Sequence, residues 1–215
     1  MSSISWVRVY RLLDSLPESA GLPPACPRVG AATILSLFMR NIVFIGLMGA
    51  GKTTVGKKLA RRLGVPFLDT DHEIERRCGT TIPVIFELEG EEGFRRREAK
   101  MIAEAMALKG HVITTGGGAV LNPENREQLK KGFVIYLDAD PEQLWFRLRS
   151  DTHRPLLTKS ADPKATLAAL HTQRAPIYKE MADLTVPTTR ASVSVVMRAI
   201  EQGLKEAEVV NHEDT

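Results

Sequence analysis

A glycine-rich segment with a single lysine, "GLMGAGKTT" at residues 46–54, follows the apolar run "NIVFI" and precedes a helical pattern. It completes the motif G-x-x-x-x-G-K-[ST] as Gly46, Gly51, Lys52 and Thr53. Glycines let successive backbone N–H groups face one hollow, and the following helix adds the positive end of its dipole. The segment therefore predicts a nucleotide site in which Lys52 meets the β- and γ-phosphates and Thr53 ligates magnesium.

Two carboxylates stand in the segment "LDTDHEIE", at the carboxyl end of the next predicted strand. Parallel sheets gather their ligands at this edge. Side chains two residues apart on an extended chain face opposite ways, so we expect Asp69 and Asp71 to have different tasks. One would support the magnesium shell and the other would accept a proton from an attacking hydroxyl. As a compatible alternative, Asp71 caps the helix "HEIERR".

Two further segments could hold the acceptor of the phosphoryl group. In "GFRRREAK", Arg95 and Glu98 share a helix face, so Glu98 can orient a guanidinium that matches a substrate carboxylate bidentately. For Arg96 and Arg97 we favour a solvated helix face. In "TTGGGAV", the run 116–118 of consecutive glycines indicates that the backbone passes very close to another group.

Arginines also gather around the polar, aperiodic residues 150–162, which we interpret as a mobile lid. Arg147 and Arg149 end the helix before this segment, Arg154 lies within it and Arg174 lies on the helix after it. A transferring phosphoryl group needs such cations, supplied when a lid closes and excludes water. Next to Pro155 in the short lid, Arg154 is the favoured candidate.

The elements that must position these residues alternate short apolar strands with helices from residue 41 onward, which is typical of a parallel α/β sheet. A long helical region, 71–110, should break at Gly79 and Gly90. Expected strands span 41–46, 65–71, 111–118, 133–140 and 183–188, and expected helices span 53–64, 123–132, 141–150, 163–182 and 192–208.

Residues 1–38 are rich in Pro, Gly, Ala and Ser without sustained periodicity, so we expect a poorly ordered extension, and Met39 could be the true start. The folded domain would then span residues 39–206, with a flexible tail at 207–215. The length of 215 residues suits one domain, and 43% hydrophobic and 26% charged residues are ordinary for a soluble protein.

The composition excludes several classes of protein. No apolar run is long enough for a membrane span. The mild net charge of +3 argues against nucleic-acid binding. Cys26 and Cys78 are far apart and outside any C-x-x-C, so neither a disulfide framework nor a zinc site is indicated, and a reducing, cytoplasmic setting is expected.

Taken in order, "GLMGAGKTT", "DTD", "FRRRE", "GGG", "RPLL" and "RAPIY" resemble the shikimate kinase family over residues 39–204. The resemblance implies a phosphate-loop NTPase fold: a three-layer α/β/α sandwich with a five-stranded parallel sheet in the order 2-3-1-4-5. It implies ATP-dependent phosphorylation of the 3-hydroxyl of shikimate on the route to chorismate and aromatic amino acids. Mg²⁺ accompanies ATP, and a monomer without nucleic-acid or membrane partners is expected.

The resemblance also implies roles for the residues that match. Lys52 and Arg154 contact the phosphates, Thr53 ligates the metal, and Asp69 supports the metal through water. Asp71 binds the ring hydroxyls and is the implied base. The implied ATP-binding set is Gly49, Ala50, Gly51, Lys52, Thr53, Thr54, Arg147 and Arg154, and the shikimate-binding set is Asp71, Arg95, Gly116, Gly117, Gly118 and Arg174.

Two departures and two rival functions accompany this interpretation. Residues 1–38 lie outside the family pattern, and Pro187 stands where the family makes its adenine contacts. A gluconate or nucleotide kinase of the same fold is one rival, although a nucleotide acceptor would favour stacking aromatics and only 6% of the chain is aromatic. The other is a nucleotide-dependent regulatory protein without turnover, in which Asp71, Arg95 or Arg154 should be missing.

Overall fold

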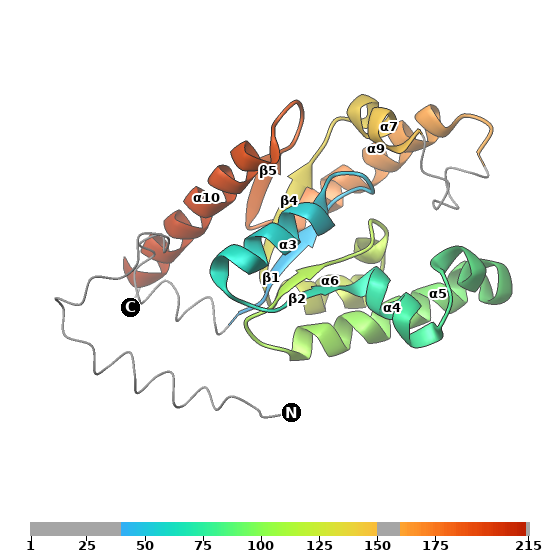
Figure 1. The fold of residues 1–215 in the computed structure, drawn as a ribbon, viewed down its shortest axis with the longest axis horizontal. Coiled ribbons are helices and arrows are strands. Elements are labelled where there is room, and N and C mark those ends of the chain that lie inside the picture. Colours follow the sequence, from blue (N-terminus) through green and yellow to red (C-terminus); the bar gives the residue numbers. More distant parts are fainter. Residues whose placement is uncertain (1–39, 150–159, 214–215) are drawn as a thin grey trace. The chain divides into compact units, whose positions relative to one another are not determined.

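A computed structural model of the chain describes residues 40–149 and 160–213, all within one unit, residues 31–215. Five strands form a parallel sheet in the order β2-β3-β1-β4-β5 (Figure 1). This order confirms the expected topology. The strands are β1 (Ile42–Ile45), β2 (Phe67–Asp69), β3 (Val112–Thr114), β4 (Phe133–Asp138) and β5 (Leu184–Pro187).

Strand β1 occupies the middle of the sheet and is fully buried, as its unbroken apolar run requires. Phe44 aligns with Thr114 of β3 on one side and with Ile135 of β4 on the other. Asp69 at the end of β2 aligns with the same Thr114. The carboxyl ends of the strands therefore meet at one edge, where the candidate residues of the first two strands come together.

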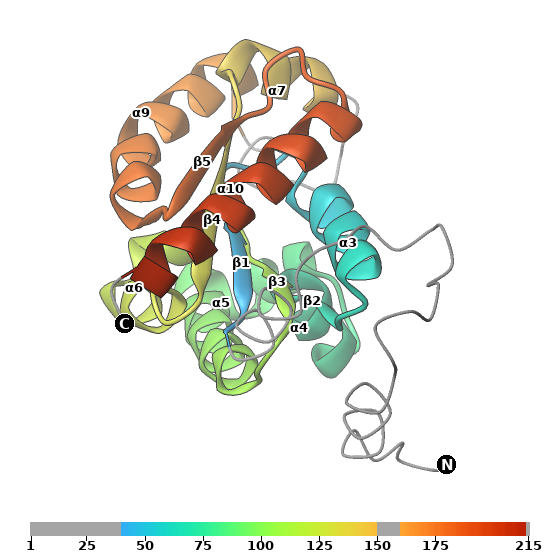
Figure 2. The ribbon, with the colours of Figure 1, turned by 90° about the vertical axis from the view of Figure 1, so that its left-hand side faces the viewer.

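Helices cover both faces of the sheet (Figure 2). Helices α3 (Lys52–Leu63) and α10 (Val193–Glu213) contact each other on one face. The other face carries α5 (Ile82–Ala107), α6 (Pro123–Leu129) and α9 (Pro163–Met181). Right-handed crossovers between parallel strands produce this distribution. The connection from β1 to β2, which contains α3, runs across the sheet in one direction. The later connections, which contain α5, α6 and α9, run in the other direction, so their helices lie on the opposite face. The result is the expected three-layer sandwich.

Helix α3 begins and ends at glycines in the left-handed conformation. Gly51 has φ 98° at the N-terminal end and Gly64 has φ 70° at the C-terminal end, the latter as predicted. Within the helix, a Cβ added to Gly56 would lie 2.8 Å from the Thr114 side chain. The missing side chain lets α3 approach the sheet closely beneath the phosphate loop.

The long helical region divides as predicted. Helix α4 (Thr70–Cys78) ends at Gly79, with φ 65°, and α5 has a non-helical residue at Gly90, with φ 70°. The two helices pack around a second, smaller apolar cluster that also includes Ile113 of β3. Its buried members are Ile74, Ile85, Phe94, Met101, Ala105 and Ile113.

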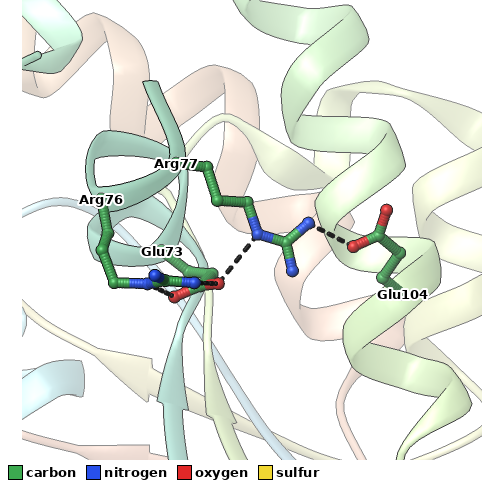
Figure 3. Close-up of polar contacts among 4 residues, drawn as sticks. All are labelled: Glu73, Arg76, Arg77 and Glu104. Carbon is green, nitrogen blue, oxygen red and sulfur yellow. Dashed lines mark hydrogen bonds and ion pairs between the residues drawn. The ribbon is translucent and has the colours of Figure 1, made fainter. Parts of the chain in front are cut away.

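Charged side chains also join α4 to α5 (Figure 3). Glu73 accepts hydrogen bonds from Arg76 Nε at 2.8 Å and from Arg77 Nε at 2.8 Å. Arg77 then reaches across to Glu104 of α5. Hydrogen bonds from Arg76 and Arg77 lower the pKa of Glu73 to about 2. The network fixes α4, which carries Asp71, against α5, which carries Arg95.

The remaining helices differ from the predictions mainly at their ends. Helix α7 (Pro141–Leu148) is slightly shorter than expected, whereas α10 continues to Glu213 rather than ending at Glu208, so helical residues enter the predicted tail. Residues 1–39 and 150–159, including most of the predicted lid, lie outside the described residues. Within the described part of the chain, no helix combines the length and apolarity needed to cross a membrane.

Candidate active site

The phosphate loop joins β1 to α3 in a conformation that requires its glycines. Gly46, Gly49 and Gly51 all have positive φ, at 135°, 77° and 98°. A Cβ on Gly46 would lie 2.7 Å from the Leu137 carbonyl oxygen of β4, so the loop also needs glycine there for space. A side chain at Gly46 would both strain the backbone and displace the loop from the sheet, whereas one at Gly49 would strain the backbone and press on Leu148, and one at Gly51 would strain the backbone alone.

Lys52 is bent back over this loop. Its side chain is 8% exposed, and Nζ donates to the carbonyl oxygens of Gly46 at 2.7 Å and Leu47 at 2.9 Å. The ammonium is thus held directly over the hollow rather than extended into solvent. Ala50 of this loop is buried, and Thr54 in the first turn of α3 lines the cleft beside the loop.

Arg147 joins the phosphate loop to the loop after β5. It donates from Nη1 to the carbonyl oxygen of Gly49 at 3.2 Å and from Nη2 to that of Thr188 at 3.3 Å. Pro187 ends β5 directly before Thr188, and the Thr188 N–H donates to the backbone carbonyl oxygen of Asp138 at 2.7 Å. Proline at this position therefore leaves the sheet bond next to it intact, and Arg147 stands beside both loops expected to hold the nucleotide.

Asp69 is the organising carboxylate at the end of β2. Its Oδ2 accepts hydrogen bonds from the hydroxyls of Thr53 and Thr114, each at 2.8 Å. Its Oδ1 accepts the backbone N–H groups of Asp71 at 3.1 Å and His72 at 3.2 Å. One side chain thus joins the first turn of α3, the end of β3 and the start of α4.

This arrangement corrects the prediction about capping. The residue that caps α4 is Asp69, whereas Asp71 lies inside the first turn of the helix. The chain is also not extended from Asp69 to Asp71 as expected, because it turns into a helix directly after Asp69. The different orientations of the two carboxylates follow from this strand-to-helix turn.

The oxygen atoms around Asp69 fit a hard divalent cation that is mostly held by nucleotide phosphates. Thr53 and Asp69 supply a hydroxyl and a carboxylate, which are oxygen ligands of the kind Mg²⁺ prefers. Among the described residues, no group of three or more His, Cys, Asp or Glu side chains could hold a metal without the nucleotide. The residues present are therefore compatible with magnesium that arrives with ATP.

Arg95 and Glu98 form the predicted pair on α5. Arg95 Nη1 lies 2.7 Å from Glu98 Oε2, and the side chains are 21% and 1% exposed. Burial raises the pKa of Glu98, partly offset by the Arg95 charge. Burial opposes the charge on Arg95, but the attraction and hydrogen bonds of Glu98 and Glu91 together outweigh it and raise the pKa of Arg95. The guanidinium therefore keeps its charge in a fixed orientation.

The three glycines confirm the expected close approach of the backbone. A Cβ on Gly116 would lie 2.8 Å from Asp71 Oδ1 and 3.0 Å from Glu98 Oε1. A Cβ on Gly118 would lie 2.5 Å from Arg95 Nη2, and one on Gly117 would lie 3.3 Å from the backbone nitrogen of Met48. The glycine turn therefore lies between the phosphate loop and the α4–α5 pair.

Arg174 completes the cationic side of the cleft from α9. It is 4% exposed, and its Nε is buried without a hydrogen-bond partner in the described part of the chain. Its charge acts on both Glu98 and Tyr178. A buried guanidinium with an unused donor at a cleft wall is suited to an anionic ligand.

One cleft of about 950 Å³ brings together these residues from both halves of the site. Arg154 lies outside the described residues, and Arg147 and Ala50 are not among those that line the cleft. Two further residues have structural contacts at the site although the sequence assigned them no role: Thr114 lies within the segment "TTGGGAV" and Tyr178 within "RAPIY". Candidates in the cleft wall are Gly49, Gly51, Lys52, Thr53, Thr54, Asp69, Asp71, Arg95, Gly116, Gly117, Gly118 and Arg174.

A phosphate loop between the first strand and first helix of a 2-3-1-4-5 parallel sheet defines a phosphate-loop NTPase fold. A family model described as "Shikimate kinase" matches residues 48–205. A shikimate kinase of Burkholderia thailandensis is 54% identical over 171 residues, covering 79% of this chain and 92% of the relative. One from Thiobacillus denitrificans is 57% identical over 161 residues, covering 74% and 87%.

Solved structures of shikimate kinases are also similar to this chain. A shikimate kinase from Acinetobacter baumannii in complex with shikimate has a TM-score of 0.77 at 43% identity, covering 81% of this chain and 98% of that one. A gluconokinase from Sinorhizobium meliloti has a TM-score of 0.53 at 17% identity, covering 83% and 98%, and shares the fold alone. The chain belongs to the shikimate kinase family.

Proposed function

We propose that the protein transfers the γ-phosphoryl group of ATP to the 3-hydroxyl of shikimate. The observation that carries this proposal is the single cleft that joins Lys52 of the phosphate loop to Asp71, Arg95 and Arg174. Membership of the shikimate kinase family supports it. The bound shikimate named for the Acinetobacter baumannii relative supports the choice of acceptor.

On the donor side, the backbone N–H groups of residues 49–54 would cradle the phosphates, with Lys52 contacting the transferred group. Lys52 would exchange its present bonds to the loop carbonyls for bonds to phosphate oxygens. Thr53 and Asp69 would hold the magnesium, directly and through water respectively. Bound magnesium neutralises charge on the phosphates. Arg147 would lie against the adenine.

On the acceptor side, Arg95 and Arg174 would bind the carboxylate of shikimate, together with backbone groups of Gly116–Gly118. Arg95 is suited to this because Glu98 fixes its orientation from behind. Asp71 would bind the ring hydroxyls, since it lies beside the glycine turn on the wall between the two cations and the phosphate loop.

The chemical step would then need little more than position and charge. The 3-oxygen of shikimate forms a bond to the γ-phosphorus, its proton passes to the Asp71 carboxylate, and the bond from phosphorus to the leaving oxygen of ADP breaks. Lys52, and Arg154 from the lid, would neutralise the transferring group. Alignment of donor and acceptor in one cleft would supply much of the rate.

Phosphoryl transfer can be tested by ADP release from the purified protein with magnesium and ATP. Shikimate, gluconate and nucleoside monophosphates are compared as acceptors, with Asp71→Asn as the control. We expect turnover with shikimate alone, and a drop of about 100-fold or more in kcat for the variant at nearly unchanged ATP affinity, since general-base catalysis contributes that much. Turnover with gluconate or a nucleotide in place of shikimate would refute the proposal, and ATP binding without any turnover would favour a regulatory protein.

The working unit is proposed to be a cytoplasmic monomer whose kinase domain spans residues 39–206, with residues 1–38 as an extension. The match of the family model, which covers residues 48–205, lies within this proposed domain and supports its end near residue 206.

A further inference from the structure

Helix α9 carries a tyrosine one turn after Arg174, on the same buried side of the helix. Tyr178 is 0% exposed, and its hydroxyl donates a hydrogen bond of 2.5 Å to the carbonyl oxygen of Gly117. The two residues are 61 positions apart in the sequence. Tyr178 is thus a direct link between the helix that carries Arg174 and the glycine turn, both of which are proposed to bind the carboxylate of shikimate.

This bond fixes the orientation of a peptide group in the cleft wall. Gly117 and Gly118 line the cleft and Tyr178 does not, so the Gly117 carbonyl points out of the cleft toward α9. In a trans peptide the N–H of the next residue points the opposite way, and no cis peptide occurs among the described residues. The Gly118 N–H is therefore directed toward the cleft.

The Gly118 N–H remains available to a ligand. The other hydrogen bonds of the turn run from Ala119 N–H to Gly116 and from Leu121 N–H to the Gly118 carbonyl oxygen, at 3.2 and 3.0 Å. The Gly118 N–H has no acceptor in the described part of the chain. Consecutive glycines have unusual conformational freedom, so this peptide needs an external anchor to hold one orientation.

The ring of Tyr178 is itself held in place. It stacks on Tyr136 of β4 with centroids 5.0 Å apart, and the Tyr136 hydroxyl donates to Asp138 at 2.7 Å. Burial raises the pKa of Tyr178 to about 12, so its hydroxyl keeps its proton at any working pH. The anchor is therefore rigid and is a permanent donor.

We propose that Tyr178 is a positioning residue for shikimate: its hydroxyl holds the Gly117 carbonyl and so presents the Gly118 N–H to the substrate beside Arg95 and Arg174. The inference rests on the proposed function, because it assigns a task within the same acceptor site. Tyr178 acts through the glycine turn and does not itself touch the substrate.

Tyr178→Phe tests this, because it removes the hydroxyl and keeps the buried ring. We expect KM for shikimate to rise between about fivefold and thirtyfold, the effect of losing one hydrogen bond and the orientation it sets. KM for ATP should stay within about twofold and kcat within about threefold, since the bond affects acceptor binding alone. A purely structural role would instead lower the melting temperature without separating the two substrates.

Tyr136→Phe is the matched control. It removes the hydroxyl from the stacked partner ring, whose hydrogen bond goes to Asp138 rather than to the glycine turn. Its KM for shikimate should stay within about twofold of the parent value. Equal KM values for the parent and Tyr178→Phe, or equal increases in both variants, would overturn the inference while leaving the proposed function intact. Absence of shikimate turnover in the parent protein would overturn both.

Discussion

Replacing Arg95 by lysine tests whether a planar cation, rather than charge alone, binds the acceptor. In the structure, Arg95 Nη1 donates to Glu98 at 2.7 Å, and Nη2 donates to Glu91 at 3.0 Å. Each of these terminal nitrogens carries a second N–H, so a fork of two donors remains for a carboxylate. A lysine can keep the ion pair with Glu98 but cannot present that fork.

The size of the effect follows from one lost charge-assisted hydrogen bond, which is worth about 1.5–3 kcal/mol. Since about 1.4 kcal/mol corresponds to a factor of ten, KM for shikimate should rise about 10- to 100-fold in Arg95→Lys. Substrate dependence is measured by coupled ADP release at saturating ATP, and ATP dependence at saturating shikimate. KM for ATP should stay within about twofold, because Arg95 lies on the acceptor side of the cleft.

Arg96→Lys is the matched control for this change. Arg96 is the next residue on α5, but its side chain is 68% exposed and pairs only with Glu92 among the described residues. Its replacement should leave both KM values unchanged. A KM for shikimate within twofold of the parent value in Arg95→Lys would refute the bidentate argument, and an equal rise in Arg96→Lys would show a general loss of helix charge instead.

Two further predictions concern the neighbouring carboxylates. Thr114→Val removes one of the two hydroxyls that hold Asp69 Oδ2. The magnesium concentration for half-maximal activity should therefore rise, by up to about fivefold for one lost hydrogen bond. A magnesium titration of activity measures this, and an unchanged midpoint would disprove the prediction. Glu73→Gln should lower the free energy of unfolding by about 1 kcal/mol at pH 7, since its partners Arg76 and Arg77 are 64% and 45% exposed and solvent screens these ion pairs. Because the pKa of Glu73 is lowered from 4.5 to about 2, its stabilisation is complete above about pH 5 and should fall by more than half at pH 3. Urea unfolding of the parent and Glu73→Gln at pH 7 and pH 3 would show this. An equal difference in unfolding free energy between the two proteins at both pH values would count against the ion pairs as its cause.

Features set by neighbours in the chain could be predicted from the sequence. Helix α6 begins at Pro123 because the ring of proline fixes φ at a value that suits the first position of a helix. Helix α3 ends at Gly64 because glycine adopts the left-handed conformation that stops a helix. The phosphate loop is equally local, since its glycines and Lys52 act within nine consecutive residues. The Arg95–Glu98 pair was also predictable, because residues three apart on a helix are neighbours whatever the rest of the fold does.

Predictions failed where local rules gave two answers. The spacing of Asp69 and Asp71 fits either an extended chain or a helix start, and only the position at which β2 turns into α4 makes Asp69 the cap. The end of α10 was missed by five residues because the sequence after Glu208 has no glycine or proline to stop it. The glycine turn was recognised as a close approach, but its neighbours could not be identified from the sequence.

The sequence by itself determined the strands, the helices, the phosphate loop and, through a resemblance, the kinase family. Tertiary structure alone decided which distant groups meet: Thr114 with Asp69, 45 residues away, and Tyr178 with Gly117, 61 residues away. These contacts depend on the order of the strands and on how α9 packs against β4, which no local pattern encodes. Because a hydrogen bond requires an approach within a few tenths of an ångström, only the packed fold can specify it.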